Sequence, residues 1–389
     1  MQSAANFGKA SFGPSYKEFQ VGEIVFLAKE KALKLSCGTE IKNFPLAFQT
    51  YGKLNESCSN AILICHALTG DQYVASTNPI TQKDGWWNFM IGSGKPIDTD
   101  KFFVICSNII GGCMGSFGPN TIDEKTGEPY SASFPLVTIN DMVAAQNLLV
   151  EHFGIKKLHA VIGGSTGGMQ ALAWSVLFPQ KVNLVLPLAT SYRHSPQNIA
   201  FHEVGRQAIM NDPNWCLGNY YAEKKYPING LAVARMTAHI TYLSHSALQK
   251  KFGRNLQDKE SFSFSFAQDF KVESYLHHQG FSFVERFDPN SYLYITKAVD
   301  YFDLEKDFGE NLSGAFVEFA KNPQAKVCLI AFSDDWLFPP SEAKKIAQAL
   351  LACSVNVSCM TIESSAGHDS FLLPNQALEN TIANFLNQK

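Results

Sequence analysis

The stretch 159–174, HAVIGGSTGGMQALAW, constrains the fold more than any other part of the sequence. An apolar run typical of a strand reaches a serine set among four glycines, and a run of helix-forming residues follows directly. A chain can turn this sharply from strand to helix only where the neighbouring residues are small, because larger side chains would clash. The segment therefore predicts a strand–turn–helix unit with Ser165 at its tip.

The residues from Gly163 to Gly167 match the pattern G-x-S-x-G, which is typical of a nucleophilic serine. Alone the pattern is weak, since about one chain in ten of this length contains it by chance. A plain glycine turn or a phosphate-binding loop is the alternative. The segment lacks the lysine of a P-loop and the G-x-G-x-x-G spacing of a dinucleotide site. A helix that starts beside Ser165 also directs its positive end at the serine, which favours a catalytic role.

Further apolar runs predict a sheet that is covered on both faces. They are apolar throughout rather than alternating, as is typical of parallel strands. Helix-like segments are expected at 141–153, ending at Gly154, at 167–178, and at 341–352 with Ser341 as N-cap. Strand–helix alternation of this kind indicates an α/β fold with a mostly parallel central sheet. The strand-like runs lie at 61–65, 102–106, 159–162, 183–188 and 327–332.

This alternation stops between about residues 190 and 325, where the sequence is rich in aromatic residues and has the period of helices. Helices are expected at 198–210, 231–243 and 291–302. We interpret 1–189 and 326–389 as the core domain, and 190–325 as a helical lid inserted between two strands. The repeat SFSFSF at 261–266 is expected to be a loop or a short amphipathic element.

Composition narrows the class of function. The chain has 389 residues and a net charge of −3, which does not favour binding to nucleic acid or to an anionic membrane. The nine cysteines have no C-x-x-C pair, so we expect buried thiols in a reducing compartment rather than a disulfide frame or a zinc site. No stretch is long and apolar enough to span a membrane, and residues 1–19 lack the apolar core of a secretory signal. A cytoplasmic location follows as an expectation.

A nucleophilic serine needs a base and an acid, which in α/β-hydrolase sheets follow it in the order serine, acid, histidine. His368 is the one histidine after the late strand-like run at 327–332, so it is the expected base. Asp334 and Asp335 both follow that run and compete for the role of the acid. The backbone N–H groups of Leu68 and Thr166 are the expected oxyanion donors, while His66 is expected to be structural.

Eight segments of the chain resemble the homoserine O-acetyltransferases of the α/β-hydrolase superfamily. In order they span the chain from about residue 40 to its end, which makes the resemblance far more specific than G-x-S-x-G alone. The segments are CHALTGD (65–71), GWWNFMIGSGKPIDTDKFFVICSNIIGGCMGSFGP (85–119), GGSTGGMQAL (163–172), QNIAFHEVGRQAI (197–209), GLAVARMTAHITYLS (230–244), FDPNSYLYITKAVDYFDL (287–304), SDDWLFPP (333–340) and AGHDSFLLP (366–374).

The resemblance implies roles for individual residues. Ser165 matches the nucleophile, His368 the base, and Asp335, directly before a tryptophan, the acid. Arg235 matches the arginine that holds a substrate carboxylate, and Asp369 the acid that holds its α-ammonium, a pairing that suits an amino acid. The sequence departs from the family at Thr166, where methionine is more common, and the threonine side chain could alter the acyl pocket.

The resemblance also implies a reaction, with acetyl-CoA as co-substrate, L-homoserine as acceptor, and neither a bound cofactor nor a metal. It further implies a homodimer. An apolar residue at Leu337 favours an acetyl donor, because the succinyl-specific relatives tend to carry arginine there. Three alternatives stay open: O-succinyl transfer to homoserine or serine, hydrolysis of carboxylic esters, and a non-catalytic binding module of the same fold.

Overall fold

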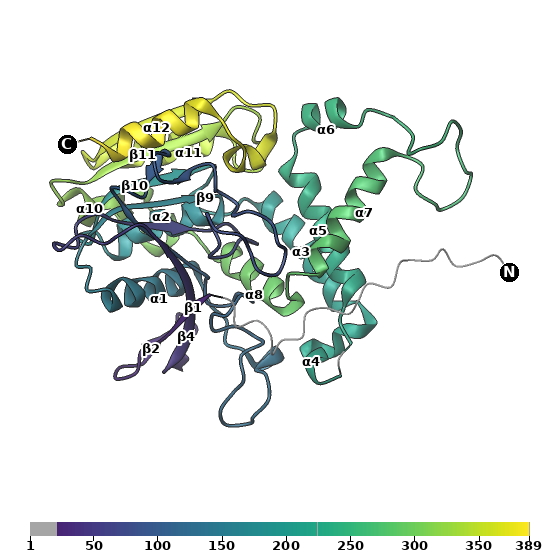
Figure 1. Cartoon of the computed structure of the whole chain (residues 1–389), viewed down its shortest axis with the longest axis horizontal. Coiled ribbons are helices and arrows are strands. Elements are labelled where there is room, and N and C mark those ends of the chain that lie inside the picture. The colour runs from purple at the N-terminus through teal and green to yellow at the C-terminus, as the bar shows by residue number, and fades with distance from the viewer. Residues whose placement is uncertain (1–21, 224, 389) are drawn as a thin grey trace.

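The computed structural model describes residues 22–223 and 225–388, which are built around one eight-stranded sheet (Figure 1). Its strand order is β1-β4-β8-β5-β9-β10-β11-β12. The strands are β1 (Glu23–Leu27), β4 (Phe44–Tyr51), β5 (Ala61–Cys65), β8 (Phe103–Ser107), β9 (Leu158–Gly164), β10 (Val182–Leu188), β11 (Lys326–Phe332) and β12 (Asn356–Ile362); two small separate pairs are β2 (Leu33–Lys34) with β3 (Glu40–Ile41), and β6 (Ile91–Gly92) with β7 (Ile97–Asp98).

The sheet is mostly parallel. From β8 to β12 every neighbouring pair is parallel, and only β1 and β4 at one edge join in antiparallel fashion. The five apolar runs predicted as strands correspond to β5, β8, β9, β10 and β11, with ends that differ by at most two residues. The expectation of an α/β fold with a mostly parallel sheet is confirmed.

The helices fall into two groups. The first group flanks the sheet: α1 (Ile139–His152), α2 (Thr166–Leu177), α11 (Pro340–Ala352) and α12 (Gln376–Leu386). The second lies between β10 and β11 in the chain: α3 (Pro196–Met210), α4 (Tyr220–Glu223), α5 (Ile228–Tyr242), α6 (His245–Lys251), α7 (Lys271–Val284), α8 (Pro289–Asp300), α9 (Leu304–Asp307) and α10 (Val317–Ala320). In Figure 1 the helices α3 to α7 lie to the right of the sheet, whereas α10 lies at its left. Short 3₁₀ helices occur at Ser131–Ser133, Pro213–Gly218, Leu312–Phe316 and Gly367–Leu372.

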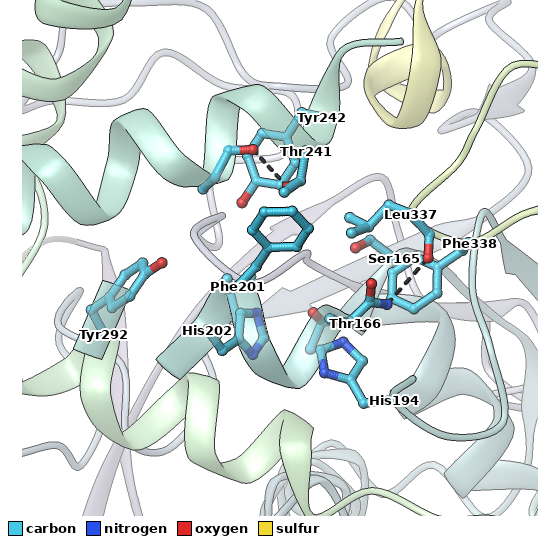
Figure 2. Close-up of a pocket in the computed structure, with 13 residues that line it drawn as sticks. Ser165, Thr166, His194, Phe201, His202, Thr241, Tyr242, Tyr292, Leu337 and Phe338 are labelled. Carbon is cyan, nitrogen blue, oxygen red and sulfur yellow. Dashed lines mark hydrogen bonds between the residues drawn. The ribbon is translucent and has the colours of Figure 1, made fainter. Parts of the chain in front are cut away.

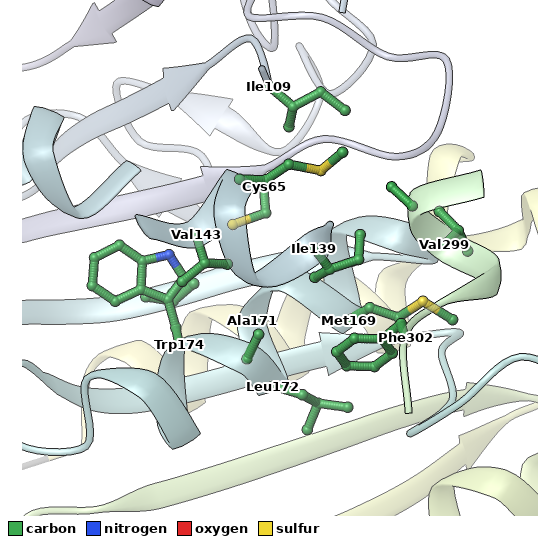
Figure 3. Close-up of a cluster of buried hydrophobic side chains, with 14 of the residues drawn as sticks. Cys65, Ile109, Ile139, Val143, Met169, Ala171, Leu172, Trp174, Val299 and Phe302 are labelled. Atoms are coloured by element: carbon green, nitrogen blue, oxygen red, sulfur yellow. The ribbon is translucent and has the colours of Figure 1, made fainter. Parts of the chain in front are cut away.

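Both faces of the sheet are buried, as the strand β5 shows. Leu63 and Cys65 belong to one hydrophobic cluster, while Ile62 and Ile64 belong to another on the opposite face. The first cluster includes α1, α2 and α11, and the second includes α12. Figure 3 shows part of the first cluster, including Trp174 of α2 and Val143 of α1. The Trp174 indole N–H donates to the Gln146 side chain of α1 at 2.8 Å, which joins the two helices. Burial on both faces explains why these strands are apolar without alternation.

Two details of the sequence reading are wrong. Ser341 is not an N-cap, because α11 begins one residue earlier at Pro340 and Pro339 holds the cap position. A proline at the first helical position loses no hydrogen bond, so the helix starts there readily. The cysteines are not uniformly buried: all nine are free thiols, but Cys37 and Cys359 are exposed.

Three further expectations concern the SFSFSF repeat, membrane-spanning helices and the N-terminal stretch. SFSFSF lies in the loop between α6 and α7, which projects away from the rest of the chain in Figure 1. Within the described residues, every helix is too short or too polar to cross a membrane. Residues 1–19, which are not expected to form a secretory signal, lie outside the described residues. The strands of the large sheet come from 23–188 and 326–362.

Candidate active site

Ser165 lies at a sharp turn between β9 and α2. Its φ and ψ angles are 59° and −124°, a strained conformation for a residue with a side chain. The flanking glycines allow the close approach that this turn requires. A Cβ atom on Gly163 would lie 2.3 Å from the Gly167 carbonyl oxygen, and one on Gly167 would lie 2.0 Å from the Cys65 carbonyl oxygen. The G-x-S-x-G pattern is thus a steric requirement of the turn.

The structure brings Ser165, His368 and Asp335 into one hydrogen-bonded chain. The Nε2 atom of His368 lies 2.8 Å from the Ser165 Oγ atom, and its Nδ1 atom lies 2.8 Å from the Asp335 Oδ2 atom. Since the carboxylate can only accept, Nδ1 donates to it and Nε2 is left to accept the serine proton. All three residues are buried and follow the carboxyl ends of strands, although 203 positions separate Ser165 from His368.

The pKa of His368 lies above its usual value because of two opposing effects. Burial of the imidazole lowers the pKa, but the charge and hydrogen bond of Asp335 outweigh burial, and Asp369 adds to them. An imidazolium at His368 is therefore stabilised. This arrangement suits a general base that must hold a proton during the reaction and then return it.

The two neighbouring aspartates have different partners. Asp335 also accepts hydrogen bonds at its Oδ1 atom from the backbone N–H groups of Leu337 and Phe338, at 3.0 and 2.9 Å. Asp334 instead accepts from the Ser246 hydroxyl, at 2.6 Å, in the segment between β10 and β11. The geometry thus favours Asp335 as the acid, the choice that the family resemblance also implied.

A cavity of about 490 Å³, open to solvent, lies over Ser165 (Figure 2). Its lining includes Ser165, Leu68, Thr166 and Leu337. The two residues that carry the expected oxyanion donors, Leu68 and Thr166, therefore line the same cavity as Ser165. The remaining lining residues are His194, Asn198, Phe201, His202, Ala238, Thr241, Tyr242, Tyr292 and Phe338.

Arg235 and Asp369 lie near this cavity without lining it. The Arg235 guanidinium stacks 5.5 Å from the ring centre of Tyr242, a lining residue, and its Nη1 atom donates to the Thr69 hydroxyl at 3.2 Å. Its Nε atom is buried without a hydrogen-bond partner. Burial raises the pKa of Asp369, while the charges of His368 and Arg235 oppose that rise. A cation with a free donor and a carboxylate therefore stand close to the triad.

The sequence reading missed a polar network in the wall of the cavity. The Nδ1 atoms of His194 and His202 lie 3.1 and 2.8 Å from the Asp300 Oδ1 atom, and Arg206 bonds the other oxygen at 2.7 Å. Burial lowers the pKa of His194 to about 4, so it is neutral at neutral pH. The segment FHEVGR contained both His202 and Arg206, but its period indicated only a helix.

Two histidines and a carboxylate can in principle hold a metal ion, and His194, His202 and Asp300 are close enough to do so. The arginine on the same carboxylate opposes this, because a guanidinium 2.7 Å from Asp300 already neutralises its charge.

His66 has a structural role as expected: its Nε2 atom accepts from the Ile109 N–H at 3.2 Å, and burial lowers its pKa to about 4.

Comparison with known proteins places this geometry in a family. Residues 60–374 match the family model described as the alpha/beta hydrolase fold. The chain is 56% identical to the homoserine O-acetyltransferase of Mesorhizobium japonicum, over 92% of this chain and 91% of that protein. It is 55% identical to the homoserine O-acetyltransferase of Pelagibacter ubique, over 92% and 95% respectively. The chain belongs to the homoserine O-acetyltransferase family.

Solved structures of similar shape include both transferases and hydrolases. The homoserine O-acetyltransferase of Bacillus anthracis has a TM-score of 0.85 at 28% identity, covering 94% of this chain and 97% of that one. The esterase E22 has a TM-score of 0.84 at 28% identity, covering 94% and 99%. A protein named as an esterase and one named as a homoserine O-acetyltransferase thus resemble this chain in backbone to nearly the same degree.

Proposed function

We propose that this protein transfers an acetyl group from acetyl-CoA to the side-chain hydroxyl of L-homoserine, the reaction that supplies O-acetylhomoserine for methionine biosynthesis. The observation that carries the proposal is the 56% identity over nearly the whole length to a homoserine O-acetyltransferase. The hydrogen-bonded chain from Ser165 through His368 to Asp335 supplies the required chemistry. Leu337, an apolar residue in the lining, favours an acetyl over a succinyl donor.

In the first half-reaction the Ser165 Oγ atom attacks the thioester carbon while His368 takes the serine proton at Nε2. The carbonyl oxygen becomes an oxyanion, which the N–H groups of Leu68 and Thr166 stabilise. The C–S bond then breaks, and the CoA thiolate leaves with the proton from His368. An acetyl ester on Ser165 remains, so the two substrates react in turn.

In the second half-reaction homoserine binds with its carboxylate on Arg235 and its ammonium on Asp369. His368 takes the proton of the side-chain hydroxyl, whose oxygen attacks the acetyl carbon. The bond from that carbon to the Ser165 Oγ atom breaks, and the serine regains its proton. The charge pairs hold the acceptor hydroxyl at the ester, which is how transfer competes with attack by water.

The segment 190–325 acts in this proposal as a lid over the serine. Many residues that line the cavity come from this segment, including Phe201 and Tyr242. The protein is further proposed to be cytoplasmic, in keeping with nine unpaired thiols, and to form a homodimer through the same segment. Its loop exposes apolar rings to solvent, with Phe264 93% exposed.

Ester hydrolysis is the second candidate, and the likeness to esterase E22 favours it. A hydrolase needs the triad and the oxyanion donors but has no use for an amino-acid site. The unpaired Nε atom of Arg235 and the nearby Asp369 carboxylate argue for the transferase. Release of acetate without an acetylated amino acid would favour the hydrolase instead.

The deciding assay crosses acetyl-CoA and succinyl-CoA with homoserine and serine, and follows both thiol release and the acylated product. Acetyl-CoA with homoserine is expected to be the preferred pair. The Ser165→Ala variant is expected to lose about 10⁴-fold or more in turnover, because no nucleophile remains. With acetyl-CoA alone, the wild type should release one burst of thiol and carry an acetyl group on Ser165. Full activity of Ser165→Ala would overturn the covalent route.

A further inference from the structure

Two arginines from the segment 190–325 bond the same residue in the loop that follows β5. The Arg286 Nη1 atom donates to the Thr69 carbonyl oxygen at 2.9 Å, and the Arg235 Nη1 atom donates to the Thr69 hydroxyl at 3.2 Å. Thr69 is adjacent to Leu68, whose N–H is the second oxyanion donor in the proposed mechanism. The loop that builds the oxyanion site is therefore held by side chains from outside the core.

Hydrogen bonds from the core reach only the ends of this loop, which spans residues 66–71, while Ala67 and Leu68 in its middle pack against core side chains. Gln170 donates to the His66 carbonyl oxygen at 3.1 Å, and Trp86 donates to the Asp71 carbonyl oxygen at 3.0 Å. Among the residues that the structure describes, the hydrogen bonds that reach the middle of the loop from elsewhere are those of Arg235 and Arg286. Apolar packing is not directional, so these two side chains supply the directional contacts that orient the backbone beside the Leu68 N–H.

The two guanidiniums carry a free-energy cost that a purely structural contact would not require. They share the ring of Phe283, at 4.6 Å for Arg235 and 5.1 Å for Arg286. Within 22–223 and 225–388 neither forms an ion pair with a carboxylate. Burial lowers the pKa of Arg286 to about 10, and the charge of Arg235 lowers it further, while Asp71 opposes the shift. A desolvated cation beside another cation costs free energy, which indicates that Arg286 is kept for function rather than for stability.

We propose that Arg286 is a positioning residue for catalysis, which holds the Thr69 carbonyl so that the Leu68 N–H is directed at the oxyanion. This inference rests on the proposed acyl transfer. Both half-reactions pass through an oxyanion at the same place, so Arg286 acts on both alike. Arg235 has a separate task, which is to bind the carboxylate of the acceptor. When that carboxylate competes with the Thr69 hydroxyl for the Arg235 guanidinium, the bond from Arg286 to the Thr69 carbonyl still holds the loop.

The test uses p-nitrophenyl acetate, a neutral ester that needs neither the CoA site nor the amino-acid site. Its burst of p-nitrophenolate reports acetylation of Ser165, and the decay of the acetyl-enzyme with homoserine reports the second half-reaction. In Arg286→Met we expect both rate constants to fall by the same factor, about 10-fold, since a misdirected oxyanion donor costs less than the ~10²–10³-fold of a deleted one. Arg286→Lys, which can still donate to the carbonyl, should recover part of the rate.

Arg254→Met is the matched control, because Arg254 is an exposed arginine of the same segment that stacks on Phe270 at 5.2 Å. It should react at the wild-type rate. If Arg286→Met does not fold, Arg286→Gln, whose amide is too short to reach Thr69, carries the same expectation. Wild-type acetylation in the Arg286 variants, with only the KM for homoserine raised, would overturn the proposal and make Arg286 a carboxylate ligand. Lack of a burst in the wild type would instead count against the acyl transfer itself.

Discussion

The floor and the wall of the cavity are built in different ways. The floor is the edge of the sheet, where Ser165, Asp335 and His368 follow β9, β11 and β12 and are held by hydrogen bonds to one another and to the backbone. The wall comes from the segment between β10 and β11, where charged side chains such as Arg206 and Asp300 hold one another. In the proposed mechanism the floor performs the acyl chemistry, while Arg235 of the wall and Asp369 beside His368 hold the acceptor.

Proteins of similar structure indicate how the floor and the wall differ in function. An esterase and a homoserine O-acetyltransferase resemble this chain almost equally, with TM-scores of 0.84 and 0.85. A triad and two oxyanion donors serve either reaction, so the floor alone does not distinguish them. What separates a transferase from a hydrolase is whether the wall holds an acceptor hydroxyl at the acetyl-enzyme better than water.

The largest effect is expected from a change in the floor, Asp335→Asn. Its amide nitrogen would replace the Oδ2 atom and donate to His368, which forces the proton onto Nε2 and blocks the base. Turnover should fall by about 10⁴-fold for both acetyl-CoA and p-nitrophenyl acetate. Rates are measured by thiol and p-nitrophenolate release.

Asp334→Asn is the matched control for this change. Asp334 lies next to Asp335 but bonds Ser246 rather than His368. Its removal should leave turnover within about two-fold of the wild type, as is usual for a residue outside such a network. An equal loss in both variants would mean that the acid has been assigned to the wrong aspartate.

A change at the proposed acceptor site, Asp369→Asn in the 3₁₀ helix Gly367–Leu372 beside His368, should separate the two functions. We expect the KM for homoserine to rise by about 10- to 100-fold, because a charged hydrogen bond contributes about 1.5–3 kcal/mol. The burst with p-nitrophenyl acetate should persist, since that ester has no ammonium group. A variant that keeps the wild-type KM for homoserine would remove Asp369 from the acceptor site.

How far the sequence predicted the site depends on which of these regions is considered. The G-x-S-x-G turn, the apolar strands and the chain order of acid and base led to Ser165 and His368, because local sterics and hydrophobic burial determine them. Arg235 and Asp369 came only from the family resemblance. Arg286 and the His194–Asp300 pair were missed, since their partners lie about 100 or more residues away and no periodicity encodes such contacts.

A smaller effect is expected in the pH dependence of acetylation. His368 must be neutral to accept the serine proton, and its pKa is raised above 6.5 by Asp335 and Asp369 despite burial. The acetylation rate should therefore fall about tenfold per pH unit below an apparent pKa that is higher than 6.5. Asp369→Asn should move this limb to lower pH because one of the two carboxylates is lost, and Asp334→Asn should not move it. Equal limbs in all three proteins would show that Asp369 does not influence the base.

The smallest effect on chemistry is expected at the tip of the segment 190–325, far along the wall from the triad. Phe264 is 93% exposed and Phe266 fully so, which costs free energy in water and favours burial against a second copy of the chain. Phe264→Ser combined with Phe266→Ser should weaken the proposed dimer, seen as a shift toward monomer in sedimentation at decreasing concentration. The burst with p-nitrophenyl acetate should stay unchanged, because neither ring contributes to the cavity over Ser165. If the tendency to dimerise is unaltered, the interface lies elsewhere. If the burst is lost, the segment 190–325 supports the position of the triad more directly than its contacts indicate.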